Sequence, residues 1–253
     1  MNAATLQLDD VSRAFGGIHA VEGVRFTAHA GETLGVIGPN GAGKSVLLNL
    51  INGLYRLDRG SITLDDTRID GLKPHQIAAR GVGRAFQSTD QFKDFIVRDY
   101  VILGRLGRQA RSMLTTALAL PHVRRSERAE RAVALETLER FRLAEAAEER
   151  LGDLPYGVQK AIDIARVIAT EPRLMLLDEP TSGTTSIERS LISDVLHEVA
   201  RTDVTLVVID HDVSFISSLS ERIVVMNVGR LLAEGTPAEV LARPDVVEAY
   251  LGV

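Results

Sequence analysis

Short apolar runs bounded by glycine, proline, asparagine or aspartate recur along the chain and predict β-strands. Other stretches repeat apolar residues at helical spacing, as Ala132, Leu135, Leu138 and Phe141 do. The expected strands are residues 5–8, 24–28, 33–37, 61–64, 82–86, 174–178, 205–210, 223–227 and 230–233. The expected helices are residues 44–52, 98–106, 126–141, 159–169, 187–202, 213–218, 237–242 and 246–250. This alternation predicts an α/β fold.

Strand signals stop after residue 86 and resume at residue 174, so the stretch between them is interpreted as a helical insertion. We expect one domain over residues 1–253, because no linker or internal repeat divides the chain. In this interpretation residues 1–87 and 164–253 form the core with an antiparallel β subdomain. Residues 88–163 form a helical subdomain.

Composition narrows the class of protein. The chain is 45% hydrophobic and 25% charged, which is typical of a soluble globular domain with a substantial core. It has no cysteine, which excludes disulfides and thiolate metal sites. The longest stretch without an acidic or basic residue is 12 residues long, too short to span a membrane, and the N-terminus lacks the basic region of a signal peptide. A net charge of −5 argues against nucleic-acid binding.

A phosphate-binding loop follows the predicted strand at residues 33–37 and precedes a predicted helix. Glycines allow such a loop to turn its backbone N–H groups toward phosphate oxygens. Lys44 is expected to reach the β- and γ-phosphates of a nucleotide, and the Ser45 hydroxyl to bind Mg²⁺. The loop and the residue after it are Gly38, Pro39, Asn40, Gly41, Ala42, Gly43, Lys44, Ser45 and Val46.

Two carboxylates end the apolar strand at residues 174–178. Ligands of open α/β sheets bind at the carboxyl ends of the strands. Asp178 is therefore expected to support Mg²⁺, and Glu179 to act as the general base that activates water. Alone, such a pair is more often a solvated acidic turn, but the phosphate-binding loop favours the functional interpretation.

The order of these motifs resembles the ATP-binding subunit of an ABC transporter, with a P-loop NTPase core. The resemblance covers essentially the whole chain. It implies roles for Gln87 (catalysis and Mg²⁺), His211 (the switch histidine) and Phe15 (stacking on adenine). The signature motif it implies comprises Leu154, Pro155, Tyr156, Gly157, Val158 and Gln159.

Local segments narrow the resemblance to branched-chain amino acid importers. They are the stretches at residues 15–20, 52–56, 73–78, 84–87 and 248–252. Neighbouring groups of that family handle urea, amides and aromatic acids. A lipopolysaccharide-export ATPase remains an alternative, as does a soluble, non-transport ABC protein, although that class carries two nucleotide domains or a long coiled-coil insertion. A non-hydrolysing partner is a further alternative, which Glu179 and His211 oppose.

The resemblance also implies cofactors, partners and location. The cofactors are ATP and Mg²⁺. Two ATPase subunits, identical or different, would face head to tail, with each ATP between one phosphate-binding loop and the other subunit's signature motif. Permease subunits would contact the helical insertion, a solute-binding protein would act indirectly, and the chain would be cytoplasmic and peripheral on the inner face of the cell membrane.

Four positions depart from the family pattern. Pro155 stands where serine is usual, Val158 where glutamine is common, Thr185 where aspartate or asparagine is usual, and Val46 where threonine is usual beside Ser45. We expect these changes to weaken one composite ATP site, and to make a different ATPase subunit the natural partner.

An arginine-rich stretch extends from Arg105 to Arg131. A solvated helix face is the simpler interpretation. As a hypothesis, this stretch from Arg105 to Arg131 lies on the membrane-facing side, where replacing Arg105, Arg108 and Arg111 would weaken membrane association, and Phe92 and Phe95 line a groove for the permease.

Overall fold

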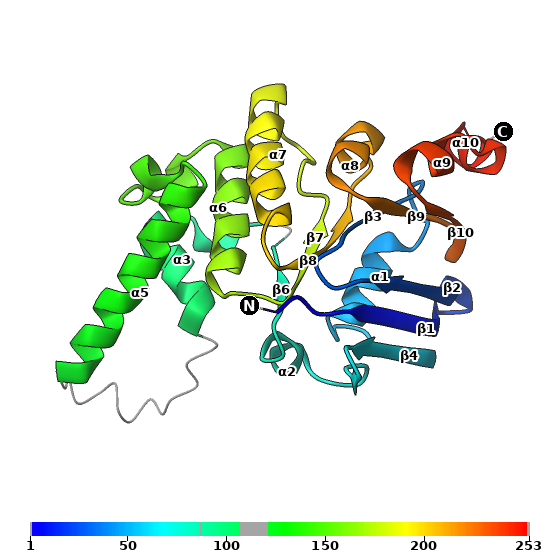
Figure 1. Cartoon of the computed structure of the whole chain (residues 1–253), viewed down its shortest axis with the longest axis horizontal. Coiled ribbons are helices and arrows are strands. Elements are labelled where there is room, and N and C mark those ends of the chain that lie inside the picture. The colour runs from blue at the N-terminus through cyan, green and yellow to red at the C-terminus, as the bar shows by residue number, and fades with distance from the viewer. Residues whose placement is uncertain (1, 87, 107–120, 252–253) are drawn as a thin grey trace.

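A six-stranded sheet forms the centre of the protein in this computed structural model, which describes residues 2–86, 88–106 and 121–251 (Figure 1). The strand order is β10-β9-β3-β8-β7-β6, and only β10 is antiparallel to its neighbour. The strands are β3 (Thr33–Ile37), β6 (Val82–Arg84), β7 (Leu174–Asp178), β8 (Thr205–Ile209), β9 (Arg222–Asn227) and β10 (Arg230–Gly235).

The parallel strands of this sheet are mostly apolar because both faces are covered, and charged residues such as Arg84 and Asp178 stand at strand ends. In β7, Leu174 and Leu176 point into one core, while Met175 and Leu177 point into the other. This alternation follows from the period of two in a strand. The sheet therefore separates two hydrophobic cores.

The first core lies between the central sheet and a smaller antiparallel sheet of order β2-β1-β4-β5. Helix α1 (Lys44–Ile51) contributes Leu47, Leu48 and Ile51 to this core. The smaller sheet comprises β1 (Leu6–Phe15), β2 (Ile18–Ala28), β4 (Arg59–Leu64) and β5 (Thr67–Arg68).

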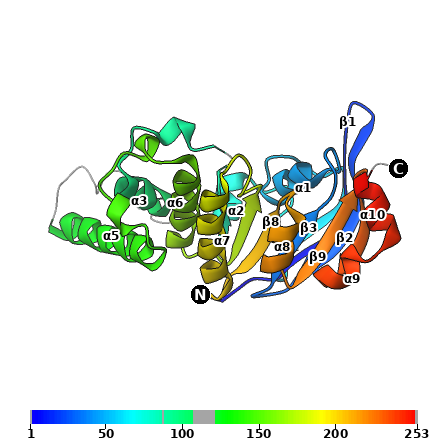
Figure 2. The ribbon, with the colours of Figure 1, turned by 90° about the horizontal axis from the view of Figure 1, so that it is seen from above.

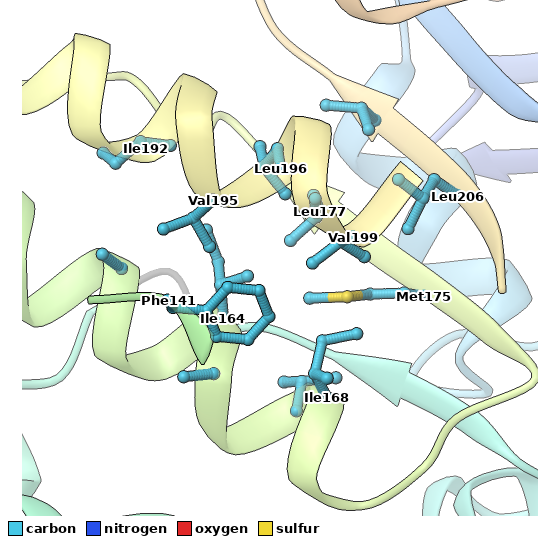
Figure 3. Close-up of a cluster of buried hydrophobic side chains, with 14 of the residues drawn as sticks. Phe141, Ile164, Ile168, Met175, Leu177, Ile192, Val195, Leu196, Val199 and Leu206 are labelled. Atoms are coloured by element: carbon cyan, nitrogen blue, oxygen red, sulfur yellow. The ribbon is translucent and has the colours of Figure 1, made fainter. Parts of the chain in front are cut away.

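The second core lies on the opposite face, beneath the remaining long helices (Figure 2). Figure 3 shows side chains of α6 and α7 in this core, with Ile168 and Val199 beside Met175 of β7 and Ile192 farther along α7. The longer helices on this side are α3 (Val97–Leu106), α5 (Pro121–Arg140), α6 (Tyr156–Ala169) and α7 (Ser186–Ala200).

Short helices complete the described elements. They are α2 (Pro74–Ala78), α8 (Val213–Leu219), α9 (Pro237–Leu241) and α10 (Pro244–Leu251), with 3-10 turns at Asp90–Phe92, Ala144–Ala146 and Leu151–Asp153. In the ranges the structure describes, no helix is long and apolar enough to cross a membrane.

The predicted strands at 33–37 and 174–178 match β3 and β7 to the residue. The β1–β2 hairpin is longer than expected, because polar residues such as Arg13, opposite Val21, and His19, opposite Ala14, continue the pairing beyond the apolar segments despite register shifts. Helix α2 and the short strand β5 were not predicted. Helices α3, α5 and α6 pack against one another (Figure 1), and the proposed boundaries of a helical subdomain at 88 and 163 stay a prediction.

Candidate nucleotide site

The loop between β3 and α1 turns sharply at glycines. Gly43 has φ +96°, and a Cβ atom built there would lie 2.2 Å from the Ala20 carbonyl oxygen. A Cβ at Gly38 would lie 2.1 Å from the Met226 carbonyl oxygen. Side chains at these positions would collide with backbone, so the loop requires glycine for space as well as for φ.

Lys44 is the first residue of α1, directly after this loop, and is only 7% exposed. Its Nζ donates hydrogen bonds to the carbonyl oxygens of Gly38, at 2.6 Å, and Pro39, at 3.0 Å. Burial lowers the pKa of Lys44, and the nearby Glu179, Asp178 and Asp210 oppose that change. The loop thus holds a desolvated ammonium group at the point where phosphates are predicted to bind.

Ser45 and Asp178 come together from α1 and β7. The Ser45 hydroxyl lies 3.4 Å from Asp178 Oδ1, at the long limit of a hydrogen bond, and the Asp178 side chain is 5% exposed. Arg84 of β6 lies 3.3 Å from Asp178 Oδ2 and also donates to Asn49 at 2.7 Å. Burial raises the pKa of Asp178, Arg84 opposes that rise, and Glu179 adds to it.

These oxygens fit a magnesium ion. Mg²⁺ prefers oxygen ligands and usually takes one or two protein groups, with water and substrate phosphates completing its octahedron. A hydroxyl and a carboxylate facing each other across 3.4 Å provide such a pair. Among the described residues there is no cluster of three or more His, Asp or Glu side chains that could hold a metal without substrate.

Glu179 occupies a constrained turn immediately after β7. Its φ is +49°, and its N–H donates to the Ile209 carbonyl of β8 at 2.8 Å. Its own carbonyl accepts from Lys160 Nζ at 3.1 Å, and Lys160 also donates to Ser182 at 2.7 Å. Because left-handed φ is costly for a residue with a side chain, this backbone must be held by its surroundings.

His211 follows the neighbouring strand β8 and reaches the same edge of the sheet. Its imidazole is 57% exposed, and Nδ1 lies 3.4 Å from Asp210 Oδ1. Asp210 is fully buried and accepts hydrogen bonds from the N–H and hydroxyl of Thr181 and from the N–H of Asp212. The buried carboxylate therefore links the loop after β7 to the loop that carries His211.

Phe15 ends β1 and is 38% exposed. Its ring meets Tyr55 edge-on with centroids 5.2 Å apart, and the Arg13 guanidinium lies 4.7 Å from its centroid. Strand β2 of this hairpin adjoins the phosphate-binding loop, since Ala20 abuts Gly43. Gln87, the other residue implied at the nucleotide, lies outside the described residues.

The predicted signature motif forms the start of α6. Pro155 is the N-cap residue and supplies no side-chain hydrogen bond, and Tyr156 is 40% exposed. Gln159 is buried, donates to the Leu154 carbonyl and accepts from Thr89. Val158 packs against the second core, so its apolar side chain supports packing within the chain.

Thr185 also has a role within the chain. It is the N-cap of α7 and forms a capping box with Glu188, whose Oε2 accepts from the Thr185 N–H and hydroxyl. The other oxygen, Oε1, accepts from the Gly157 N–H of the signature motif at 2.9 Å.

Sequence reasoning missed Arg84, Lys160, Asp210 and Glu188. Arg84 and Asp210 carried a usable signal, because each is a charged residue at the carboxyl end of an apolar strand. Lys160 and Glu188 lie on helices, and only the packing of α6 beside the loop after β7 and beside α7 reveals their contacts.

The structure corrects the assignment of Arg105 to a membrane-facing surface. Its side chain is 16% exposed and pairs with Glu130 of α5, and it also donates to the Ala169 carbonyl. A guanidinium satisfied by these groups is part of the packing between helices. Arg108 and Arg111 lie outside the described residues. Phe92 packs against Phe86 and Tyr100, whereas Phe95 is 40% exposed.

A groove of about 360 Å³ lies between the core and the helices around α3 and α6. Its walls include Asn52, His75 and Val82 from the core side and Gly104, Arg166 and Thr170 from the helical side. The Arg166 guanidinium is held by Asp163 at 2.7 Å. The groove is separate from Lys44 and Ser45, which do not line it.

The family model described as "ABC transporter" matches residues 21–182, which is more than half of the sequence. The chain therefore belongs to the ABC transporter family and is an ATP-binding ATPase of that class. A second model, described as "Branched-chain amino acid ATP-binding cassette transporter", matches residues 230–253.

Individual relatives agree. The chain is 36% identical to the high-affinity branched-chain amino acid transport ATP-binding protein BraF of Pseudomonas aeruginosa over 253 residues, covering 100% of this chain and 99% of that protein. It is 34% identical to LivG of Escherichia coli over the same coverage. It is 30% identical to the lipopolysaccharide export system ATP-binding protein LptB of Escherichia coli, covering 98% of each.

Solved structures show the same fold. A nucleotide-free ATP-binding cassette from an ABC transporter superposes with a TM-score of 0.85 at 26% identity, covering 99% of this chain and 100% of that one. The ADP conformation of MJ1267, an ATP-binding cassette of an ABC transporter, gives 0.84 at 26% identity, with full coverage of both chains. The predicted P-loop ATPase fold is confirmed.

Proposed function

We propose that the chain is the ATP-hydrolysing subunit of an importer for branched-chain amino acids or a related small polar solute. The observation that carries the proposal is the match of residues 230–253 to the branched-chain ATP-binding cassette model, together with identities of 34–36% to BraF and LivG over the whole chain. The lipopolysaccharide-export alternative has the weaker support of a 30% identical relative.

In the proposed mechanism, residues of this chain bind and polarise ATP. The phosphate-binding loop and Lys44 would hold the β- and γ-phosphates. Ser45, Asp178 and Gln87 would hold Mg²⁺, which would supply positive charge to neutralise the phosphates, and Phe15 would stack on adenine. Glu179 accepts a proton from the attacking water, and His211 contacts the γ-phosphate from the neighbouring strand.

Hydrolysis would require a second ATPase subunit. The signature motif of one subunit would cover the ATP bound by the other. Exposed apolar side chains near that motif support such an interface: Tyr156 is 40% exposed and Ile187 at the start of α7 is 84% exposed. Closure on ATP and reopening after hydrolysis would drive the transport cycle.

Permease subunits would bind the groove between the core and the helices around α3 and α6. Its lining includes Val82 and Gly83, a few residues before Gln87. A permease segment inserted in the groove would therefore be coupled to conformational changes near the bound nucleotide. This docking would place the chain on the inner face of the cell membrane, with the solute-binding protein on the other side.

The proposal is tested by isolating the tagged chain from its native membranes and identifying the proteins that remain bound. We expect permease subunits of the branched-chain type, and ATPase activity that rises when a binding protein loaded with leucine, isoleucine or valine is added to the reconstituted complex. Copurification with lipopolysaccharide-export components, or stimulation by lipopolysaccharide alone, would refute it.

A further inference from the structure

The carboxylate of Glu188 joins two segments that the proposed ATP-bound dimer needs. Oε2 accepts hydrogen bonds from Thr185, at 2.8 Å from its N–H and 2.9 Å from its hydroxyl. Oε1 accepts from the Gly157 N–H at 2.9 Å. One side chain thus closes the N-terminus of α7 and reaches the N-terminus of α6 at the same time.

The fit at Gly157 is close. A Cβ atom at this position would lie 2.2 Å from the Glu188 Cβ and 2.6 Å from its Cγ. The glycine therefore allows the α6 backbone to approach Glu188. Pro155, the N-cap, supplies no side-chain hydrogen bond to this helix end. An anion from α7 occupies the position where a capping side chain would otherwise accept.

The N-terminus of a helix attracts anions through its N–H groups and its dipole. The Thr185 and Gly157 N–H groups lower the pKa of Glu188, so the carboxylate is ionised at neutral pH. A phosphate group of a facing subunit's ATP would meet both an occupied N–H group and a negative charge. Like charges at one helix end oppose each other.

We propose that Glu188 is a positioning residue that holds the signature loop in a form unable to accept phosphate, so that ATP-driven pairing requires its carboxylate to leave Gly157. This inference rests on the proposed function. Glu188 would oppose ATP-driven pairing of the two subunits, because the hydrogen bond between Glu188 and the Gly157 N–H must break before the second subunit's ATP binds there.

The chain contains a matched control. Thr236 and Glu239 form a capping box at α9 with nearly the same geometry: Glu239 Oε2 accepts from the Thr236 N–H at 2.9 Å and from its hydroxyl at 2.8 Å. In both boxes the glutamate N–H donates to the threonine hydroxyl oxygen at 3.4 Å. Glu188 differs in the additional bond to the signature motif.

The experiment measures the ATP concentration for half-maximal dimerisation, by light scattering, in a Glu179→Gln background that cannot hydrolyse ATP. We expect Glu188→Gln to lower that concentration about fivefold, the size of a charge effect at a helix end, and the gain to shrink at high salt. Glu239→Gln should leave it unchanged. A role limited to helix capping would give no gain from Glu188→Gln.

The outcomes are distinguishable. If the Glu179→Gln chain dimerises with ATP and Glu188→Gln leaves the half-maximal concentration unchanged or raises it, the inference is overturned while the proposed function stands. An equal gain from Glu239→Gln would overturn the inference in the same way. If the Glu179→Gln chain shows no ATP-dependent pairing with itself or with a copurifying ATPase subunit, both the proposed dimer and this inference are refuted.

Discussion

At the edge of the central sheet, Lys44 and Asp210 are 7% and 0% exposed, and hydrogen bonds from the same chain hold each of them. At the start of α6, Tyr156 is 40% exposed and Pro155 supplies no side-chain bond. The sheet edge is therefore already organised, whereas Tyr156 in the first turn of α6 is exposed to solvent.

The two regions differ in what a single chain can complete: the charged groups at the sheet edge are satisfied within the chain, and the exposed start of α6 is not covered by it. Buried charges must be satisfied internally, because an unpaired one is costly. An exposed helix start carries no such desolvation cost, because water satisfies its polar groups, and it remains accessible to a second molecule. The following substitutions test the contrast, in order of decreasing effect.

Removing the proposed base should have the largest effect. Glu179→Gln keeps the shape of the side chain but cannot accept a proton at neutral pH, so we expect the turnover number for ATP to fall about 10²–10⁴-fold with little change in ATP affinity. Steady-state ATPase assays and nucleotide titration measure the two quantities. Glu248→Gln, at an exposed position on α10, is the control. Near-normal turnover in Glu179→Gln would contradict the role.

Lys44→Ala should weaken MgATP binding about a hundredfold, because the phosphates lose a charge-assisted contact. Isothermal titration calorimetry with MgATP measures this affinity. Lys93→Ala is the matched control, since the Lys93 side chain is 54% exposed and pairs with Asp90 on the surface. An unchanged affinity in the Lys44 variant would refute the assignment of the phosphate-binding loop.

The same contrast between buried and exposed charge extends to the helices. Arg105→Gln removes a guanidinium that is 16% exposed from its contacts with Glu130 and the Ala169 carbonyl, and should lower the free energy of unfolding by about 2 kcal/mol. Chemical denaturation measures this loss. Arg128→Gln, exposed on α5, should change it by less than about 0.5 kcal/mol. Equal effects would argue that Arg105 is not held by packing.

The smallest effect concerns the exposed motif itself. Pro155→Ser restores a hydroxyl at the N-cap of α6 and should raise the ATPase rate of the chain about tenfold, if a single hydrogen bond to phosphate is gained in the transition state. Adding Val158→Gln tests the second departure, although Val158 packs against the core. An unchanged or lower rate in both variants would show that this site was not impaired.

Much of the fold was accessible from local patterns. Apolar runs predicted β3 and β7, because a strand buried on both faces appears in the sequence as a continuous apolar run. Glycine spacing predicted the loop around Gly43, since only glycine tolerates the approach of Ala20. The full length of the β1–β2 hairpin and helix α2 were not predicted, because their polar residues show no hydrophobic periodicity.

The functional groups of the candidate site could be predicted from sequence alone. They are a lysine and a hydroxyl after a glycine-rich turn, two carboxylates at the end of one buried strand, and a histidine after the next buried strand. Tertiary structure decided which groups meet. It placed Arg84 against Asp178, buried Arg105 against Glu130, and brought Glu188 of α7 to the first turn of α6. The reason is physical: local periodicity specifies which face of an element is buried, but contacts between charged side chains on different elements depend on how those elements pack.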